Sequence, residues 1–142
     1  MTDQELLFAA IQAGRKAYAP YSHYKVGCSL LAQDGTVFVG CNVENASYGA
    51  AICAERNALA AAIAAGKRQF QTIAIAGVRE GEQESVPAYP CGICRQVIRE
   101  FATPGLRILI AKGSFSDESP YVYEEYTVEE LLPHSFTLSN GE

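Results

Sequence analysis

Two apolar runs with a helical pattern between them constrain the fold of this chain most. The first run is Thr-Ile-Ala-Ile-Ala-Gly-Val at residues 72–78, and the second covers residues 106–111. Such runs are typical of strands that are buried on both faces of a sheet. Residues 91–101 between them place Val97, Ile98 and Phe101 on one helical face. This order of strand, helix and strand predicts a right-handed crossover between two parallel strands.

A hairpin is predicted earlier in the chain. Residues 25–31 and 36–42 have β-rich compositions and flank the dipeptide Asp34-Gly35, which is a strong signal for a two-residue turn. With these two residues as the turn, the register places Cys28 opposite Cys41. We interpret this pair as two small thiols packed in the sheet rather than as a disulfide.

Helices are predicted at 3–18, 53–65, 91–101 and 128–132. Thr2 with Glu5, and Thr127 with Glu130, have the spacing of capping boxes at the start of the first and last of these helices. Gly66 is placed to cap the end of the second helix. The acidic, Tyr-rich segment 113–125 has no clear pattern apart from a strand expected around residues 121–123.

Length and charge limit the class of protein. A chain of 142 residues with 49% hydrophobic content suits one packed core, so we expect residues 1–142 to form a single domain. The net charge of −5 argues against a nucleic-acid partner. The acidic start of the chain is unlike a signal peptide, and no apolar run reaches the ~18 residues of a membrane span. We therefore expect a cytoplasmic protein with no membrane partner.

The five cysteines are an odd number, which favours reduced thiols used for metal binding or packing. Cys91 and Cys94 are spaced to bind one metal ion from a single helical turn, and Cys53 offers a third thiolate. The fourth tetrahedral position of a zinc ion would then be left for water. Glu55 follows Cys53 closely and is the candidate acid and base beside that water.

Other interpretations of these cysteines remain open from the residues alone. A structural zinc site would need a fourth protein ligand, for which the candidates are Cys28, Cys41, His23 and His134. A redox dithiol also uses two cysteines with a two-residue spacer. Glu55 favours the catalytic site, because a structural zinc site has no need of a carboxylate beside it.

The predicted helix starts support the same site. Cys53 and Cys91 each begin a predicted helix, where free amides and the positive end of the helix dipole favour thiolate over thiol. Three thiolates and Zn²⁺ together carry a net negative charge, which a neighbouring cation would offset. Arg56 or Arg95 could supply it, and Arg56 is nearer in sequence to Cys53 and Glu55. The alternative is an ordinary surface arginine.

The motifs together resemble those of the zinc-dependent deaminases. The segments Cys53-Ala54-Glu55 and Pro90-Cys91-Gly92-Ile93-Cys94 match the signature of that group. The chain is also similar to the small homotetrameric cytidine deaminases over nearly its whole length. The segments that carry this resemblance are residues 18–22 (Tyr-Ala-Pro-Tyr-Ser), 41–46 (Cys-Asn-Val-Glu-Asn-Ala), 53–56 (Cys-Ala-Glu-Arg), 91–96 (Cys-Gly-Ile-Cys-Arg-Gln) and 130–133 (Glu-Leu-Leu-Pro).

This resemblance implies a three-layer α/β/α fold with a mixed, mostly five-stranded sheet. It implies one zinc ion per chain, held by Cys53, Cys91 and Cys94. It also implies that Asn42 and Glu44 hold the ribose. The further implied substrate contacts are Tyr24, which lies against the pyrimidine where most relatives have phenylalanine, and Ala54.

The resemblance further implies a homotetramer whose active sites are completed by neighbouring subunits. Residues matching Ala46 and Tyr48 reach a neighbour's ribose in such relatives, and the residue matching Phe136 covers a neighbour's pyrimidine. For Phe136 the alternative is an ordinary core residue. Tyr89 replaces a usual serine at the rim of the site.

The implied reaction is hydrolytic deamination of cytidine and 2′-deoxycytidine to uridine and 2′-deoxyuridine with release of ammonia, a step of pyrimidine salvage. Glu55 would take a proton from the zinc-activated water and later protonate the departing amine. The alternatives are a deaminase of modified or antibiotic cytosine nucleosides, and a structural-zinc interaction module without turnover.

Overall fold

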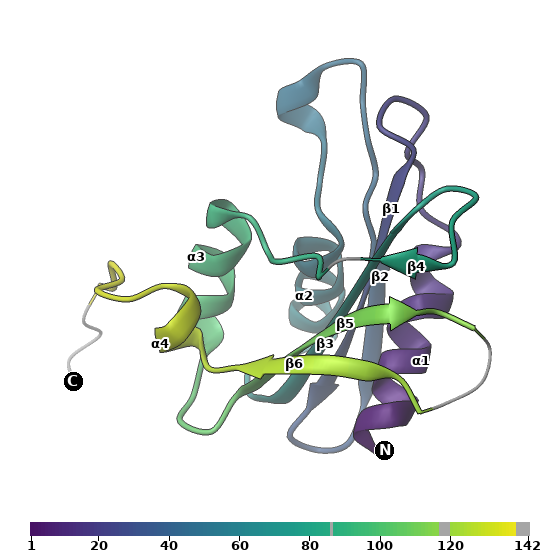
Figure 1. Cartoon of the computed structure of the whole chain (residues 1–142). Coiled ribbons are helices and arrows are strands. Elements are labelled where there is room, and N and C mark those ends of the chain that lie inside the picture. The colour runs from purple at the N-terminus through teal and green to yellow at the C-terminus, as the bar shows by residue number, and fades with distance from the viewer. Residues whose placement is uncertain (86, 117–119, 139–142) are drawn as a thin grey trace.

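The structure of the chain, a computed structural model, describes residues 1–85, 87–116 and 120–138. The helices are α1 (Asp3–Gly14), the 3-10 turn η1 (Tyr48–Ala50), α2 (Ala54–Ala64), α3 (Gly92–Phe101) and α4 (Val128–Leu131). The strands are β1 (Tyr24–Ala32), β2 (Val37–Cys41), β3 (Phe70–Arg79), β4 (Glu84–Ser85), β5 (Arg107–Ser114) and β6 (Val122–Tyr126). Figure 1 shows the sheet with helices on both of its faces.

The sheet is mixed. Its strands run in the order β2-β1-β3-β5, with β6 paired to β5, and the two-residue strand β4 also pairs with β5. β1 is antiparallel to both β2 and β3, whereas β3 and β5 are parallel, as the strand, helix and strand order predicts. The predicted fold, a three-layer α/β/α arrangement around a mostly five-stranded mixed sheet, is therefore confirmed.

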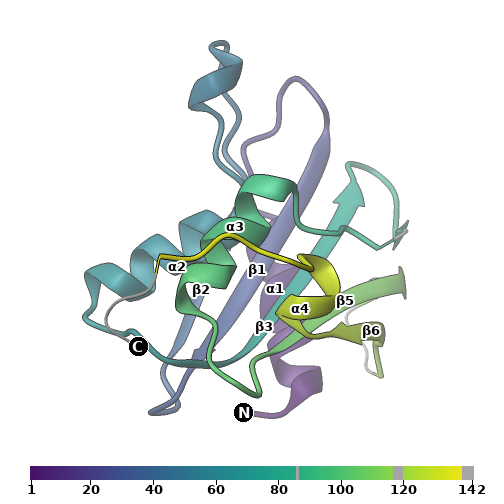
Figure 2. The same ribbon diagram turned by 90° about the vertical axis from the view of Figure 1, so that its left-hand side faces the viewer.

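Two hydrophobic clusters lie on the two faces of this sheet. On one face, Leu6 and Leu7 of α1 pack with Leu109 of β5. On the other face, Leu59 of α2 and Ile98 of α3 pack in a larger cluster with residues of β1, β3 and β5. Figure 2 shows α2 and α3 side by side in front of the sheet, with α1 behind it. The first turns of α2 and α3 thus lie on the same face.

The predicted register of the hairpin is wrong by one residue. Cys28 pairs with Gly40, and Cys41 pairs with Gly27. The connection is a three-residue loop, because the Ala32 amide donates to the Thr36 carbonyl at 2.8 Å and Gly35 takes a positive φ of 93°. A shift of one residue turns side chains to the other face, so Cys28 and Cys41 do not face each other. All five cysteines are free thiols.

The predicted helix starts are largely confirmed, and the first helix is shorter than predicted. Both capping boxes are present, and Gly66 has a positive φ at the end of α2. α1 ends at Gly14 rather than at residue 18, because the backbone of Tyr18 bonds to Asn42 and Glu44 beyond the end of β2. The strand expected around residues 121–123 is β6; residues 117–119 of that Tyr-rich segment lie outside the described residues.

Candidate active site

Three thiols converge where α2 and α3 begin. Cys53 is the N-cap residue of α2, Cys91 is the N-cap residue of α3, and Cys94 lies in the first turn of α3. Their sulfur atoms lie within 4.8 Å of one another, and the Cys53 and Cys91 sulfurs are 3.8 Å apart. Sulfurs around a tetrahedral zinc ion, each at about 2.3 Å, lie about 3.8 Å apart. The donor set therefore fits zinc.

A fourth protein ligand is missing from this cluster among the residues that the structure describes. In that part of the chain, the group of side chains close enough to hold one metal ion consists of Cys53, Cys91 and Cys94, without Cys28, Cys41, His23 or His134. A structural zinc site normally has four protein ligands, whereas a catalytic site has three and keeps one position open. The geometry favours the catalytic kind of site.

Glu55 lies in the first turn of α2, beside Cys53. Its side chain is only 4% exposed. Burial raises the pKa of the Glu55 carboxyl to about 7, and the neighbouring Cys53 thiolate also raises it. A carboxyl group with a pKa near neutrality is able to take up and release a proton at physiological pH. The position and the surroundings of Glu55 therefore suit an acid and base.

Arg56 contacts the sulfur cluster directly. Its Nη2 atom donates to the Cys53 sulfur at 3.7 Å. The pKa of the Cys53 thiol is lowered to about 5, because its sulfur accepts hydrogen bonds from the Cys94 thiol and from Arg56. The pKa of the Cys94 thiol is raised, because this thiol donates its proton in a hydrogen bond to the Cys53 sulfur and because Cys94 is buried. A metal ion would displace that proton.

Arg95, the other cation considered from the sequence, has a different role. Its Nε atom donates to the Pro90 carbonyl at 2.7 Å and its Nη1 atom to the Leu131 carbonyl at 2.6 Å. These bonds fasten the start of α3 to the end of α4. Arg56 is thus the arginine that faces the sulfurs.

A cavity of about 520 Å³ opens beside the sulfurs. Four of the residues expected to bind substrate line it together with Cys53, Cys91 and Glu55. These four residues are Tyr24, Asn42, Glu44 and Ala54. Other lining residues are not predicted from the sequence, where only their closeness to predicted site residues indicates them: Ser22, Val26, Pro87 and Ala88.

The polar side chains of this cavity are held by backbone groups. Asn42 accepts from the Val26 amide at 2.8 Å and donates to the Tyr24 carbonyl at 2.9 Å. Glu44 accepts from the amides of Tyr21 and Ser22 and from the Ser22 hydroxyl. The Ser22 hydroxyl holds the pKa of Glu44 below its usual value. Glu44 therefore presents a fixed carboxylate to the cavity.

Tyr24 and Ala88 pack closely over a glycine of β3. A Cβ atom on Gly77 would lie 2.7 Å from both the Tyr24 hydroxyl and the Ala88 methyl group. The absence of a side chain at Gly77 therefore allows the Tyr24 ring to lie against the sheet. The ring forms part of one wall of the cavity.

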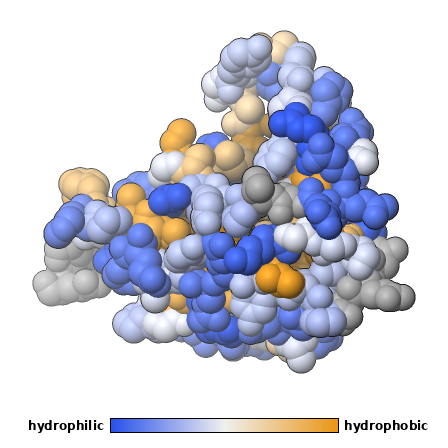
Figure 3. All heavy atoms as spheres, in the orientation of Figure 1, coloured by the Kyte–Doolittle hydropathy of each residue, from blue (hydrophilic) through white to orange (hydrophobic). Residues whose placement is uncertain are grey.

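The remaining expected substrate residues lie away from this cavity. Ala46 is exposed, Tyr48 is 82% exposed and Phe136 is 69% exposed. Tyr48 begins η1, at the tip of a segment that projects from the molecule in Figures 1 and 2. The alternative of Phe136 as a core residue is wrong. Figure 3 shows that hydrophobic patches interrupt the polar surface on the side where α3 and α4 lie.

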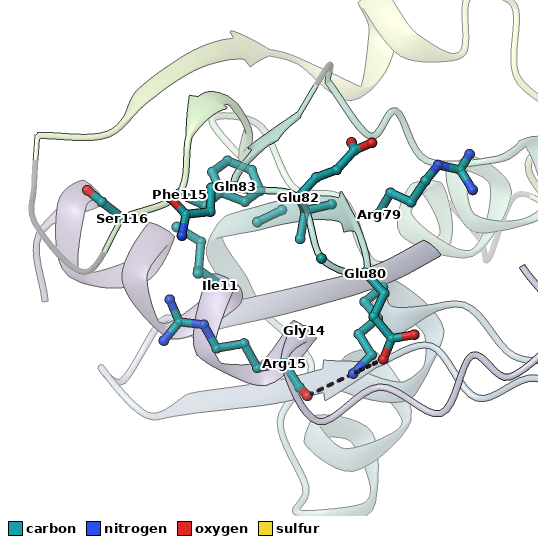
Figure 4. Close-up of a pocket in the computed structure, with 13 residues that line it drawn as sticks. Ile11, Gly14, Arg15, Arg79, Glu80, Glu82, Gln83, Phe115 and Ser116 are labelled. Atoms are coloured by element: carbon teal, nitrogen blue, oxygen red, sulfur yellow. Dashed lines mark hydrogen bonds and ion pairs between the residues drawn. The ribbon is translucent and has the colours of Figure 1, made fainter. Parts of the chain in front are cut away.

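A second cavity, of about 460 Å³, lies between α1 and the end of β3 (Figure 4). At its edge, Lys25 contacts the Arg15 carbonyl at 3.4 Å and the Glu80 carboxylate at 3.5 Å. None of the described residues that line this cavity is a cysteine or a histidine. This cavity is therefore distinct from the sulfur cluster.

None of the helices in the described part of the chain has the length and apolar character needed to cross a membrane.

Comparisons with known proteins agree with this geometry. The family model described as "Cytidine and deoxycytidylate deaminase zinc-binding region" matches residues 1–109. The chain is 43% identical over 137 residues to the cytidine deaminase of Halalkalibacterium halodurans, covering 96% of each chain. It is 40% identical over 139 residues to that of Sporosarcina psychrophila, covering 96% of this chain and 93% of the relative.

A solved structure is similar as well. The crystal structure of cytidine deaminase from Burkholderia pseudomallei superposes with a TM-score of 0.80 at 45% identity, covering 96% of this chain and 100% of that chain. The family match includes the segments that carry the three thiols and Glu55. The chain belongs to the family defined by the zinc-binding region of the cytidine and deoxycytidylate deaminases.

Proposed function

We propose that this protein hydrolyses cytidine and 2′-deoxycytidine to uridine and 2′-deoxyuridine with release of ammonia. The observation that carries this proposal is a single cavity that joins Cys53 and Cys91 of the sulfur cluster and the buried Glu55 to the polar pair Asn42 and Glu44. The relatives with 40% and 43% identity are named cytidine deaminases, which supports cytosine nucleosides as the substrates.

The proposed zinc ligands are Cys53, Cys91 and Cys94. Zinc held by these thiolates supplies a Lewis acid that lowers the pKa of water. Arg56 donates to the Cys53 sulfur and so offsets the negative charge of the thiolates. In this role Arg56 supports the metal site without touching the substrate.

Glu55 moves the protons of the reaction. Its carboxylate accepts a proton from the attacking water and delivers it to the ring nitrogen next to the reacting carbon. It then takes the second proton from the hydroxyl group that the water has formed on the reacting carbon and passes it to the amine, so that a carbonyl forms as the carbon–nitrogen bond breaks and ammonia leaves. Its burial keeps bulk water away and strengthens these charge interactions.

The remaining cavity residues would bind and orient the nucleoside. Glu44 has an ionised carboxylate that is able to accept a hydrogen bond from a ribose hydroxyl, and Asn42 lies beside it. The flat face of Tyr24 suits a pyrimidine ring. Ala54 lines the same cavity next to Glu55.

Two alternatives have less support. The Asn42 and Glu44 pair favours nucleosides with an ordinary ribose over antibiotic nucleosides, and the relatives above are named for cytidine. A structural-zinc module without turnover does not explain why the carboxyl group of Glu55 is buried beside three thiols. Neither alternative explains the whole cavity.

The exposed aromatic residues support assembly into a homotetramer. Tyr48 and Phe136 expose most of their side chains, although large aromatic side chains usually bury more of their surface. In the proposed assembly Ala46, Tyr48 and Phe136 complete a neighbour's cavity. Light scattering on the purified protein tests the state: a mass near four chains is expected, and a monomer would reject it. We also propose that the reaction is a step of pyrimidine salvage in the cytoplasm.

The substrate proposal is tested by incubating the purified, zinc-quantified protein with cytidine, 2′-deoxycytidine and blasticidin S, and measuring ammonia release. Turnover of the first two compounds is expected. A protein with one zinc per chain and no release of ammonia from cytidine would be inconsistent with the proposal. Preferential turnover of blasticidin S would favour the antibiotic alternative.

A further inference from the structure

Tyr89 lies on the cavity wall next to the sulfur cluster. It precedes Pro90 and Cys91 in the chain, and it lines the cavity together with Pro87, Ala88 and Cys91. Its side chain is 48% exposed, so packing in the core does not hold it in place. The position of its ring must therefore be set by specific contacts.

Those contacts come from β6, at the edge of the sheet, and a lysine of β5 supports them. The Tyr89 hydroxyl donates to Oε1 of Glu124 at 2.7 Å, and the Tyr126 hydroxyl donates to the same oxygen at 2.6 Å. Lys112 contacts Oε2 of Glu124 at 3.1 Å. The rings of Tyr89 and Tyr126 meet edge to face, with centroids 6.0 Å apart and an interplanar angle of 71°.

Glu124 is the centre of this network. The hydroxyls of Tyr126 and Tyr89, followed by the Lys112 ammonium group, lower the pKa of its carboxyl to about 2. Glu124 is therefore ionised throughout the physiological range and accepts both hydroxyl bonds as a carboxylate. Charge-assisted hydrogen bonds of this kind are shorter and stronger than neutral ones.

The chemistry of the site determines which part of a substrate meets this wall. The reacting carbon must lie beside the sulfurs and Glu55, so the amine-bearing edge of the pyrimidine faces that end of the cavity. The chain segment that leads into Cys91 forms the wall there, and Tyr89 is the largest side chain on that segment.

We propose that Tyr89 is a specificity-determining residue that limits the size of the group on the reacting amine, and that Glu124 is the positioning residue that holds it. The inference rests on the proposed function. The site then accepts the unsubstituted amine of cytidine and discriminates against N4-alkylated cytidines, whose hydrolysis would release an alkylamine in place of ammonia.

The first test compares kcat/KM for cytidine and N4-methylcytidine in the zinc-loaded enzyme. Tyr89→Ala is expected to raise the ratio of N4-methylcytidine to cytidine hydrolysis by about tenfold or more, since one methyl group in a pocket is worth about 10- to 200-fold. Tyr89→Phe keeps the ring and loses its bond to Glu124, so a smaller rise is expected. Tyr123→Phe is the matched control, because Tyr123 lies next to Glu124 on β6 and bonds to Asp3 instead.

The second test separates positioning from general stability. Glu124→Ala is expected to raise the same ratio when Tyr89 is present and to leave it unchanged in the Tyr89→Ala background. Glu125→Ala is the control, because Glu125 is the next residue of β6 and pairs with Arg107. A purely structural role of Glu124 would lower both activities together and leave the ratio constant.

A binding measurement gives an independent result. In the Glu55→Gln background, which binds without turnover, calorimetry with N4-methylcytidine should show tighter binding after Tyr89→Ala. If wild type hydrolyses cytidine but neither the ratio nor this affinity changes, the specificity inference is wrong and the proposed function stands. If zinc-loaded wild type fails to hydrolyse cytidine, the proposed function fails, and the inference that depends on it fails too.

Discussion

The sulfur atoms of Cys53 and Cys91 lie 3.8 Å apart although the two cysteines are 38 residues apart in the chain. Each is the N-cap residue of its helix, and neither side chain makes a capping hydrogen bond. Both helices pack on the same face of the sheet. The sheet therefore brings two helix starts together and leaves their thiols available to one metal ion.

Because the zinc ligands come from two helices, zinc should stabilise the fold. Removing the metal with a chelator is expected to lower the thermal unfolding midpoint. A ligand that binds only the native state raises the free energy of unfolding by about 1.4 kcal/mol for each tenfold increase of the free ligand concentration above its Kd. Differential scanning calorimetry with and without zinc measures this. An unchanged midpoint in protein shown to have lost its zinc would contradict the prediction.

Glu55→Gln should remove most turnover while keeping the fold and the metal. The amide has nearly the same shape as the carboxyl but cannot carry protons, and loss of a general acid and base typically costs about 100- to 10,000-fold in rate. Measurements of kcat and of zinc content check this. Glu129→Gln is the control, because the Glu129 side chain is 73% exposed on α4. Near-normal turnover by Glu55→Gln would refute the assigned role.

Arg56→Ala should weaken zinc binding. The guanidinium donates to the Cys53 sulfur, and loss of a group that supports a metal ligand typically costs about 10- to 100-fold in metal affinity. Competition with a chromogenic chelator gives the affinity. Arg68→Ala is the matched control, since Arg68 donates to the Ile63 and Lys67 carbonyls rather than to a sulfur. Equal affinities of the two variants would argue against a role of Arg56 at the metal.

Gly40→Ala should destabilise the protein, because α2 lies directly on β2 at this point. A Cβ atom there would lie 2.5 Å from the Ala58 amide nitrogen and 2.6 Å from the Ala54 carbonyl oxygen. Such overpacking typically costs about 1–3 kcal/mol, and here it would also displace the helix that carries Cys53. Urea denaturation measures the loss. Gly49→Ala, with open space around its Cβ position, should have no comparable effect.

Asp3 should make the stability depend on pH at the acid end. Its hydrogen bond from Arg107 holds the pKa of Asp3 below its usual value. The carboxyl has a lower pKa in the folded state than in the unfolded state, so its stabilisation is present above about pH 4 and is lost as the pH falls through the folded-state pKa. Asp3→Asn should cost about 1 kcal/mol at pH 7, given the partial exposure of the pair.

The difference between Asp3→Asn and wild type should shrink as the pH falls from 5 towards 2. Unfolding in urea at several pH values measures it. Glu100→Gln, at an exposed position of α3, serves as the control. A difference that does not change with pH would mean that the Asp3 carboxylate does not contribute through its ionisation.

The types of the main helices and strands and the zinc chemistry of the site are readable from the amino-acid sequence. Apolar runs predicted the parallel strands, because burial on both faces excludes polar residues from them. Capping residues such as Thr2 and Gly66 marked helix ends, because these signals act over a few neighbouring residues. The spacing of Cys91 and Cys94, with Glu55 beside Cys53, indicated zinc chemistry for the same local reason.

The register of the hairpin and the neighbours of each site residue depend instead on the three-dimensional packing of the chain. The Asp34-Gly35 signal is compatible with loops of different length, and a change of one residue separated Cys28 from Cys41. The choice of Arg56 over Arg95 depended on where each guanidinium finds acceptors. Tyr89 and Glu124 are 35 residues apart in the chain, and contacts at that separation are set by strand pairing and packing rather than by local sequence.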